Sequence, residues 1–281
     1  MTRFIQAQHA RILNMAVTSW FVTAVIGQWI FGVYVLLFYG TATLKGHPSD
    51  WNKVLPNGYV TGDIMGNVVV GSHLLLAITI IFGGPLQLIP KVRNRMPVFH
   101  KWNGRCYILS AFVTSLSGFY MVWVRGSVGG IVQHVSISIN AILIIVFAVL
   151  AMKYARARNI KKHRIWAIRL FLVMNGVWFF RVGLNFWLFM NQGIVGFNPK
   201  TFEGPFLNIL SFSQYLLPLL LFELYTIAKK SPNKRFVQVV AVIVMVFIIV
   251  MAIGIFSASK SVWLPRITEV LFTNSITWTN M

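Results

Sequence analysis

The sequence predicts an all-α, polytopic membrane protein with seven transmembrane helices, and three features lead to this fold class. Of its 281 residues, 57% are hydrophobic and only 11% are charged, whereas soluble domains carry about 25% charged residues. Seven apolar segments reach the roughly 20 residues that a helix needs to cross a bilayer. The positive charges fall between these segments, which is typical of loops on the two sides of a membrane. We therefore expect residues 1–281 to form a single membrane domain.

The expected helices divide into a four-helix core at residues 66–190 and three accessory helices. The first apolar segment is too long for the core of a signal peptide, so we interpret it as a retained helix. The tail at residues 258–281 is rich in aromatic residues, which favour the lipid head-group zone, so we expect an amphipathic or interfacial segment there. The seven expected spans are residues 12–38, 66–89, 98–123, 131–152, 164–190, 207–228 and 236–257.

The charge is strongly biased toward one side of the expected bundle. The chain has 25 Lys and Arg against five acidic residues, for a formal charge of +20. If the seven segments alternate, 18 cations lie on the side of the N-terminus, six on the other, and Arg181 inside a helix. This bias predicts a bacterial cytoplasmic membrane protein with its N-terminus in the cytoplasm and its C-terminus outside. The cations are expected to meet anionic lipid, and no nucleic acid partner is expected.

Cysteine usage limits the cofactors that the chain can bind. Cys106 is the only cysteine, so an internal disulfide is excluded. Structural zinc, iron–sulfur clusters and covalently attached c-type haem are not expected either, because each needs several cysteines or a paired motif.

Four histidines are the candidate functional residues, one near an end of each expected helix from the second to the fifth. With alternating helices, His73 and His134 lie at one depth and His100 and His163 at the other. A histidine in a membrane span is costly unless it is paired, so it is a functional hypothesis by default. Two such pairs match two b-type haems, each held by two neutral imidazoles from facing helices. The alternatives are a hydrogen bond to a neighbouring Ser, Asn or carbonyl for His73, and an interfacial position for His100 and His163.

Cations near these histidines are candidates for binding haem propionates. Arg105 and Arg169 are expected near the inner pair, and Arg181 near the outer pair. Arg181 has no acidic residue nearby in the sequence, so it needs an anionic partner. A propionate and the carboxylate of Asp63 are equally good candidates for that partner.

Two families resemble this chain. The four histidines on successive helices resemble the cytochrome b561 superfamily, in which helices two and four share one haem and helices three and five share the other. In detail, residues 66–190 resemble a bacterial multipass membrane family of unknown function (DUF2306). The residues that carry this resemblance are His73, Gly84-Pro85-Leu86-Gln87, the H-x-x-x-G-R-x-Y run from His100 to Tyr107, the H-R-x-W-x-x-R run from His163 to Arg169, and Arg181.

The resemblance implies transmembrane electron transfer through two haems b. The motif of ascorbate-using members is absent around His134, so the expected donor is a quinol or another small redox molecule. Whether the chain is a membrane oxidoreductase and whether it forms a homodimer are left open. The alternative is a non-redox transporter or sensor that uses the intramembrane His and Arg residues and Glu223 for protons or a small solute. A haem-modifying membrane enzyme is a third reading, for which no specific motif is present.

Overall fold

The computed structural model describes the backbone of residues 2–272 and the side chains of residues 11–272, and within this range it is helical, without strands. The longer helices are α1 (Thr2–Leu44), α2 (Ile64–Leu88), α4 (Pro97–Trp123), α5 (Ile131–Arg156), α6 (Ile160–Met174), α7 (Gly176–Met190), α8 (Pro205–Ala228) and α9 (Lys234–Ala258). The short elements are η1 (Pro48–Lys53), α3 (Pro90–Arg95), the π-helical turn η2 (Ser259–Trp263) and α10 (Leu264–Phe272).

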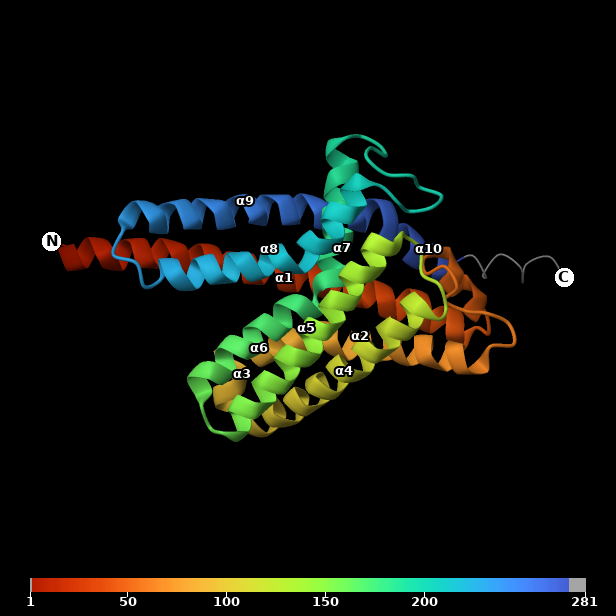
Figure 1. Ribbon diagram of the computed structural model, residues 1–281, viewed down its shortest axis with the longest axis horizontal. Helices are drawn as coiled ribbons and strands as arrows, with labels where there is room; N and C mark the ends of the chain where they lie inside the picture. The colour runs from red at the N-terminus through yellow and green to blue at the C-terminus, as the bar shows by residue number, and fades with distance from the viewer. Residues whose placement is uncertain (1, 273–281) are drawn as a thin grey trace.

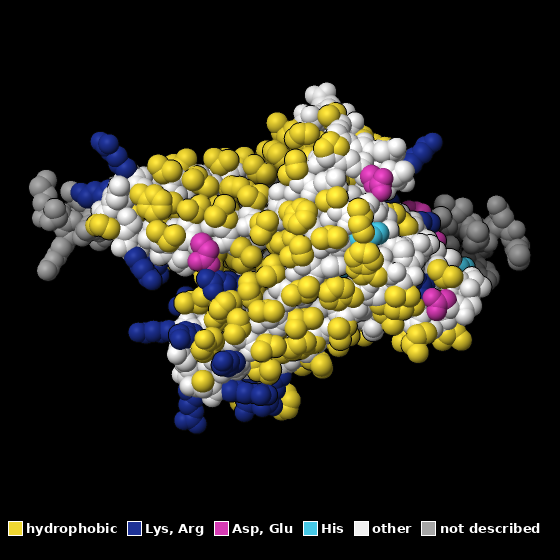
Figure 2. All heavy atoms as spheres, in the orientation of Figure 1, with side chains coloured by type: hydrophobic (Ala, Val, Ile, Leu, Met, Phe, Trp, Pro, Cys, Tyr) yellow, Lys and Arg dark blue, Asp and Glu magenta, His cyan; other side chains and the backbone are white. Residues whose placement is uncertain are grey.

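The prediction of a polytopic membrane protein is confirmed. Six helices are long and apolar enough to cross a membrane, and the count is seven if α6 and α7 together form one bent span. Many large apolar side chains are exposed on these helices, Ile64 at 79% and Leu75 at 66% among them. Figure 2 shows apolar side chains over the flanks of the helices and Lys and Arg at their ends, many of them around the end of the bundle that carries α3. This distribution is typical of helices surrounded by lipid.

The helices form two lobes that meet along part of their length (Figure 1). In one lobe, α1 and α9 pack along each other and α8 lies beside them. In the other, α2 packs on α4, α4 on α5, and α5 on α6. The core expected at residues 66–190 also included residues 176–190, which form α7 and leave this bundle. Contacts between α1 and α2 and between α5 and α8 join the lobes, and α7 packs on α9.

The expected span at residues 164–190 is interrupted in the structure. It is broken at Asn175, where α6 and α7 meet at a bend of 50°. The side-chain amide of Asn175 donates to the carbonyl of Phe171 at 2.7 Å, and the amide of Asn140 on α5 donates to the carbonyl of Val173 at 3.2 Å. Asparagine side chains thus bond carbonyls of α6 just before the bend. These bonds lower the cost of an interrupted helix inside the membrane.

The connection after α1 forms a cap that is tied to the last described helix. Lys45 donates to the carbonyl of Val270 at 2.9 Å, and Lys53 pairs with Glu269 at 2.8 Å and with Asp50 at 3.1 Å. The hydrogen bonds to Glu269 and Asp50 raise the pKa of the Lys53 ammonium. Helix α10 is amphipathic, since it buries Val270 and exposes the polar side chains of Thr268 and Glu269. The rest of the expected interfacial tail, at residues 273–281, lies outside the described residues.

Gly254 permits the close approach of α9 to α7. A Cβ at this position would collide with the carbonyl oxygen of Val182 and lie 2.7 Å from its Cγ1 atom. Backbone cannot move aside as a flexible side chain does, so we expect Gly254→Ala to destabilise the protein by roughly 1–3 kcal/mol. The measurement is thermal unfolding in detergent. The matched control is Gly118→Ala on α4, where a Cβ meets nothing within 4 Å; equal losses from both variants would contradict the expectation.

Candidate functional site

The motif residues on α2 and α4 are packed against each other. A Cβ on Gly84 would lie 2.9 Å from the ring of Tyr107. Asn103 donates to the carbonyl of Gly83 at 2.9 Å, and Gln87 donates to the carbonyl of His100 at 3.0 Å. The two motifs therefore fit together as a close helix contact between small residues and amides. This contact fixes the backbone of α4 at His100.

His100 and His163, the predicted inner pair, both lie near the start of their helices, α4 and α6. They lie close enough to interact electrostatically. The Nδ1 atom of His163 lies 2.9 Å from the carbonyl oxygen of Ala151 on α5. A carbonyl only accepts, so Nδ1 carries the proton and the Nε2 lone pair of His163 is left free. The Nδ1 atom of His100 is buried without a hydrogen-bond partner among the described residues.

His73 is held in the same protonation pattern in the opposite half of α2. Its Nδ1 atom lies 2.7 Å from Ser117 Oγ, and that hydroxyl lies 3.2 Å from the carbonyl oxygen of Thr114. The single hydroxyl proton of Ser117 is donated to Thr114, so Ser117 accepts from His73 Nδ1–H. The Nε2 lone pair of His73 is therefore available as well. His73 therefore makes the hydrogen bond to a neighbouring serine that was one alternative from the sequence. This bond leaves Nε2 free to bind a metal.

His134 differs from the other three histidines. Its Nε2 atom lies 3.3 Å from the carbonyl oxygen of Ser127, and its ring lies edge-on to Trp123, with ring centroids 5.8 Å apart. In this arrangement Nε2 donates to the α4–α5 connection. Between His73 and His134 the structure records no contact within the described range. Their pairing on one haem stays a prediction.

The three arginines have different partners. Arg105 is exposed and lies over the Trp102 ring at 4.7 Å. Arg169 lies over Trp166 at 4.6 Å and pairs with Glu223 at 2.7 Å. The expected propionate role of these two residues stays a prediction, and Arg169 already has a carboxylate partner.

Arg181 lies inside the membrane without an acidic partner among the described residues. Its guanidinium lies 5.4 Å from the Phe31 ring centroid, donates to the carbonyl of Val177 at 3.3 Å and interacts electrostatically with His73. Asp63, the rival partner expected from the sequence, pairs instead with Arg125 at 2.9 Å. The guanidinium charge of Arg181 therefore still requires an anionic partner, on the same side of the bundle as His73.

A polar centre at the helix break was missed by sequence reasoning. Asn140, Asn175 and Gln214 are 6%, 3% and 5% exposed, and they come from α5, the break and α8. A Cβ on Gly176 would lie 2.8 Å from Asn140 Nδ2 and 3.5 Å from Gln214 Oε1, so both amides lie at the start of α7. The Oδ1 atom of Asn140 is buried without a partner in the described part of the chain. The sequence does carry a signal for this centre, because Asn140, Asn175 and Gln214 each lie within an apolar segment. A search for charged residues does not detect such amide side chains.

The described residues contain no group of three His, Cys, Asp or Glu side chains placed to bind a metal ion. A haem needs no such group, because its ring supplies four ligands to the iron and the protein supplies the axial ones.

Comparison with known proteins gives one family. No curated protein and no solved structure matches the chain. The match to a family model covers residues 70–200, which run from α2 through α7 and include all four candidate histidines and the three arginines. Over these residues, slightly under half of the chain, the protein is similar to the family described as "Predicted membrane protein (DUF2306)".

Proposed function

We propose that the protein transfers electrons across the membrane through b-type haem, with histidines of the four-helix core as axial ligands. The observation that carries this proposal is the protonation pattern of the histidines. His163 and His73 each donate Nδ1–H to an oxygen of the protein and leave Nε2 free. Histidines that bind a metal usually donate their other ring N–H to an oxygen of the protein in this way, because the bond sets the tautomer and the ring orientation.

The inner site, formed by His100 and His163, has the stronger structural support. The two side chains are near enough to influence each other electrostatically, and the Nδ1 atom of His100 is buried without a partner among the described residues. A buried nitrogen without a hydrogen bond is costly, and a ligand that occupies it removes this cost. Haem bound there would supply a one-electron carrier, while Ala151 O fixes the orientation of His163 and the Gln87 contact fixes the backbone at His100.

For the outer site we propose the predicted ligands His73 and His134, with Arg181 as the cation for a propionate. The free Nε2 atom of His73 supports this assignment, as does the lack of an acidic partner for Arg181 within the described part of the chain. A quinol is the proposed donor, and its oxidation to the quinone releases two protons and two electrons, which pass to two one-electron acceptors. We propose a cytoplasmic N-terminus in the bacterial inner membrane on the charge bias alone.

A second function is favoured by the break between α6 and α7. Discontinuous helices with buried polar side chains near the middle of the membrane are typical of solute sites in transporters. Asn140, Gln214 and the first turn of α7 form such a centre here, with one amide oxygen unpaired. A transporter or sensor for a small polar solute is therefore the alternative.

The absorption spectrum of the protein, purified from cells supplied with a haem precursor, separates the two functions. We expect a Soret band in the oxidised protein and α bands of low-spin haem b after reduction with dithionite. A haem content near two per chain supports both sites, and a content near one supports the inner site only. Folded protein without haem would reject electron transfer and leave the solute site as the better proposal.

A further inference from the structure

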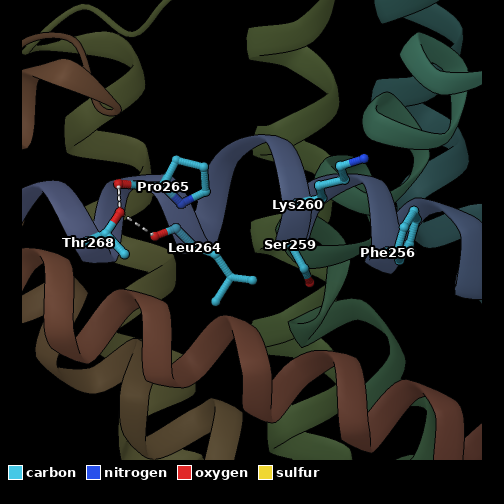
Figure 3. Close-up of a pocket in the computed structure, with 6 residues that line it drawn as sticks. All are labelled: Phe256, Ser259, Lys260, Leu264, Pro265 and Thr268. Carbon is cyan, nitrogen blue, oxygen red and sulfur yellow. Dashed lines mark hydrogen bonds between the residues drawn. The ribbon is translucent and has the colours of Figure 1, made fainter.

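A pocket lies at the elbow where α9 continues into α10. The 25 residues of α9 extend about 37 Å at 1.5 Å per residue, which is enough to cross the hydrocarbon core. The pocket, about 520 Å³ in volume, lies along the end of α9, the π-helical turn η2 and α10. Its lining is drawn in Figure 3 and consists of Phe256, Ser259, Lys260, Leu264, Pro265 and Thr268. Ligand pockets in proteins measure about 300–1,000 Å³, so the size is adequate for a ligand.

The lining combines apolar walls with one cation. Phe256 and Leu264 are 58% and 55% exposed, and Pro265 is exposed beside them. Lys260 is exposed on the same elbow, and in Figure 3 its side chain extends away from α1 while Leu264 points toward it. The candidate span that contains α9 runs on to Phe272. Because α9 alone is long enough to cross the hydrocarbon core, we place its end, and Lys260, at the boundary with the head groups. Lysines at helix ends place their ammonium groups at that level.

Lys260, like Arg266 on α10, lacks a hydrogen-bond or ion-pair partner among residues 11–272, whereas several other cations of the loops have one. Lys45 bonds Val270, Lys53 pairs with Glu269, and Arg125 pairs with Asp63. Lys260 has no hydrogen bond or ion pair within residues 11–272. Its ammonium group is therefore available to bind an anion whose apolar part contacts the apolar side chains of the pocket.

We propose that this elbow binds one anionic phospholipid, with the phosphate on Lys260 and an acyl chain along Phe256, Leu264 and Pro265. The charge of Lys260 selects an anionic head group, and the exposed apolar walls select a chain. A soluble phosphate ester would pair with the Lys260 ammonium but would leave the apolar side chains of the pocket exposed. The proposal does not depend on haem.

The test is native mass spectrometry of the full chain, with phosphatidylglycerol and phosphatidylcholine of identical acyl chains added in turn. We expect one phosphatidylglycerol to be retained more strongly than phosphatidylcholine. A lysine near the head groups contributes about 1 kcal/mol to binding an anionic lipid, so Lys260→Gln should weaken phosphatidylglycerol binding about fivefold. Lys260→Arg should retain binding. The matched control is Lys200→Gln, which removes one exposed charge from the connection after α7.

Three results would overturn the proposal. They are equal retention of the two lipids, an equal effect of Lys260→Gln and Lys200→Gln, and full displacement of phosphatidylglycerol by glycerol phosphate. The last result would identify a site for soluble phosphate esters. Leu264→Ser tests the apolar wall separately, and it should weaken both lipids while preserving the preference between them. A Leu264→Ser variant that binds both lipids as the parent does would also contradict the proposal.

Discussion

His163→Ala is expected to remove the inner haem and to lower the haem content from two per chain to one. The imidazole is an axial ligand in the proposed site, and Ala151 on α5 already accepts its Nδ1 proton, so an alanine leaves the iron with a single ligand. The measurement is the pyridine haemochrome content together with the α-band spectrum of the reduced protein. His47→Ala is the matched control, because this histidine is exposed in the connection after α1.

His73→Ala completes this test for the outer half of the bundle. We expect the outer haem to be lost while the spectrum of the inner one is preserved. Ser117 loses only a hydrogen-bond donor in this variant, so the contact between α2 and α4 should persist. Loss of both haems from either single variant, in a protein that still unfolds cooperatively, would contradict two independent sites.

Arg125→Ala is expected to cause the largest loss of stability. The Arg125 side chain is only 4% exposed, and its guanidinium joins the end of α4 to the connection before α2. It pairs with Asp63 Oδ2 at 2.9 Å and donates to Asn67 Oδ1 and to the carbonyls of Asn57 and Gly58. Removal of one partner of a buried ion pair costs about 3–5 kcal/mol. Since Asp63 is 39% exposed and recovers some hydration, we expect about 2–4 kcal/mol.

The measurement for Arg125 is the thermal unfolding midpoint in detergent. Arg125→Lys should recover only part of the loss, because an ammonium keeps the charge but cannot reach several acceptors in the planar arrangement of a guanidinium. A variant as stable as the parent would show that the cap is held by other contacts, such as the pair between Lys53 and Glu269.

The membrane-spanning segments were readable from the sequence because the bilayer imposes a simple rule. Every spanning segment must be about 20 residues long and apolar, and the expected edges agree with the helices at both ends of α5 to within a few residues. The break at Asn175 was not readable, because no proline is present there. The bend is accompanied by hydrogen bonds from Asn175 and from Asn140, the latter 35 residues earlier in the chain.

For the candidate site, too, the sequence identified some features and only the structure identified the others. The four histidines and Arg181 were found from residue type and position, since polar groups in apolar segments are rare. Their partners depend on which helix faces which, and sequence spacing does not contain this information. The carboxylate of Asp63 was an equal candidate for Arg181 until the fold placed Arg125 beside it.

The sequence by itself determined that this protein is helical, crosses the membrane several times and carries one histidine on each helix of its core. These properties follow from local composition, because a segment's transfer into lipid depends mainly on its own residues. Only the tertiary structure decided that His73 and His163 donate through Nδ1, that no carboxylate of the described residues pairs with Arg181 and that amides gather at a broken helix. Those properties depend on contacts between distant segments, where a single hydrogen bond decides which atom of a side chain is free to act.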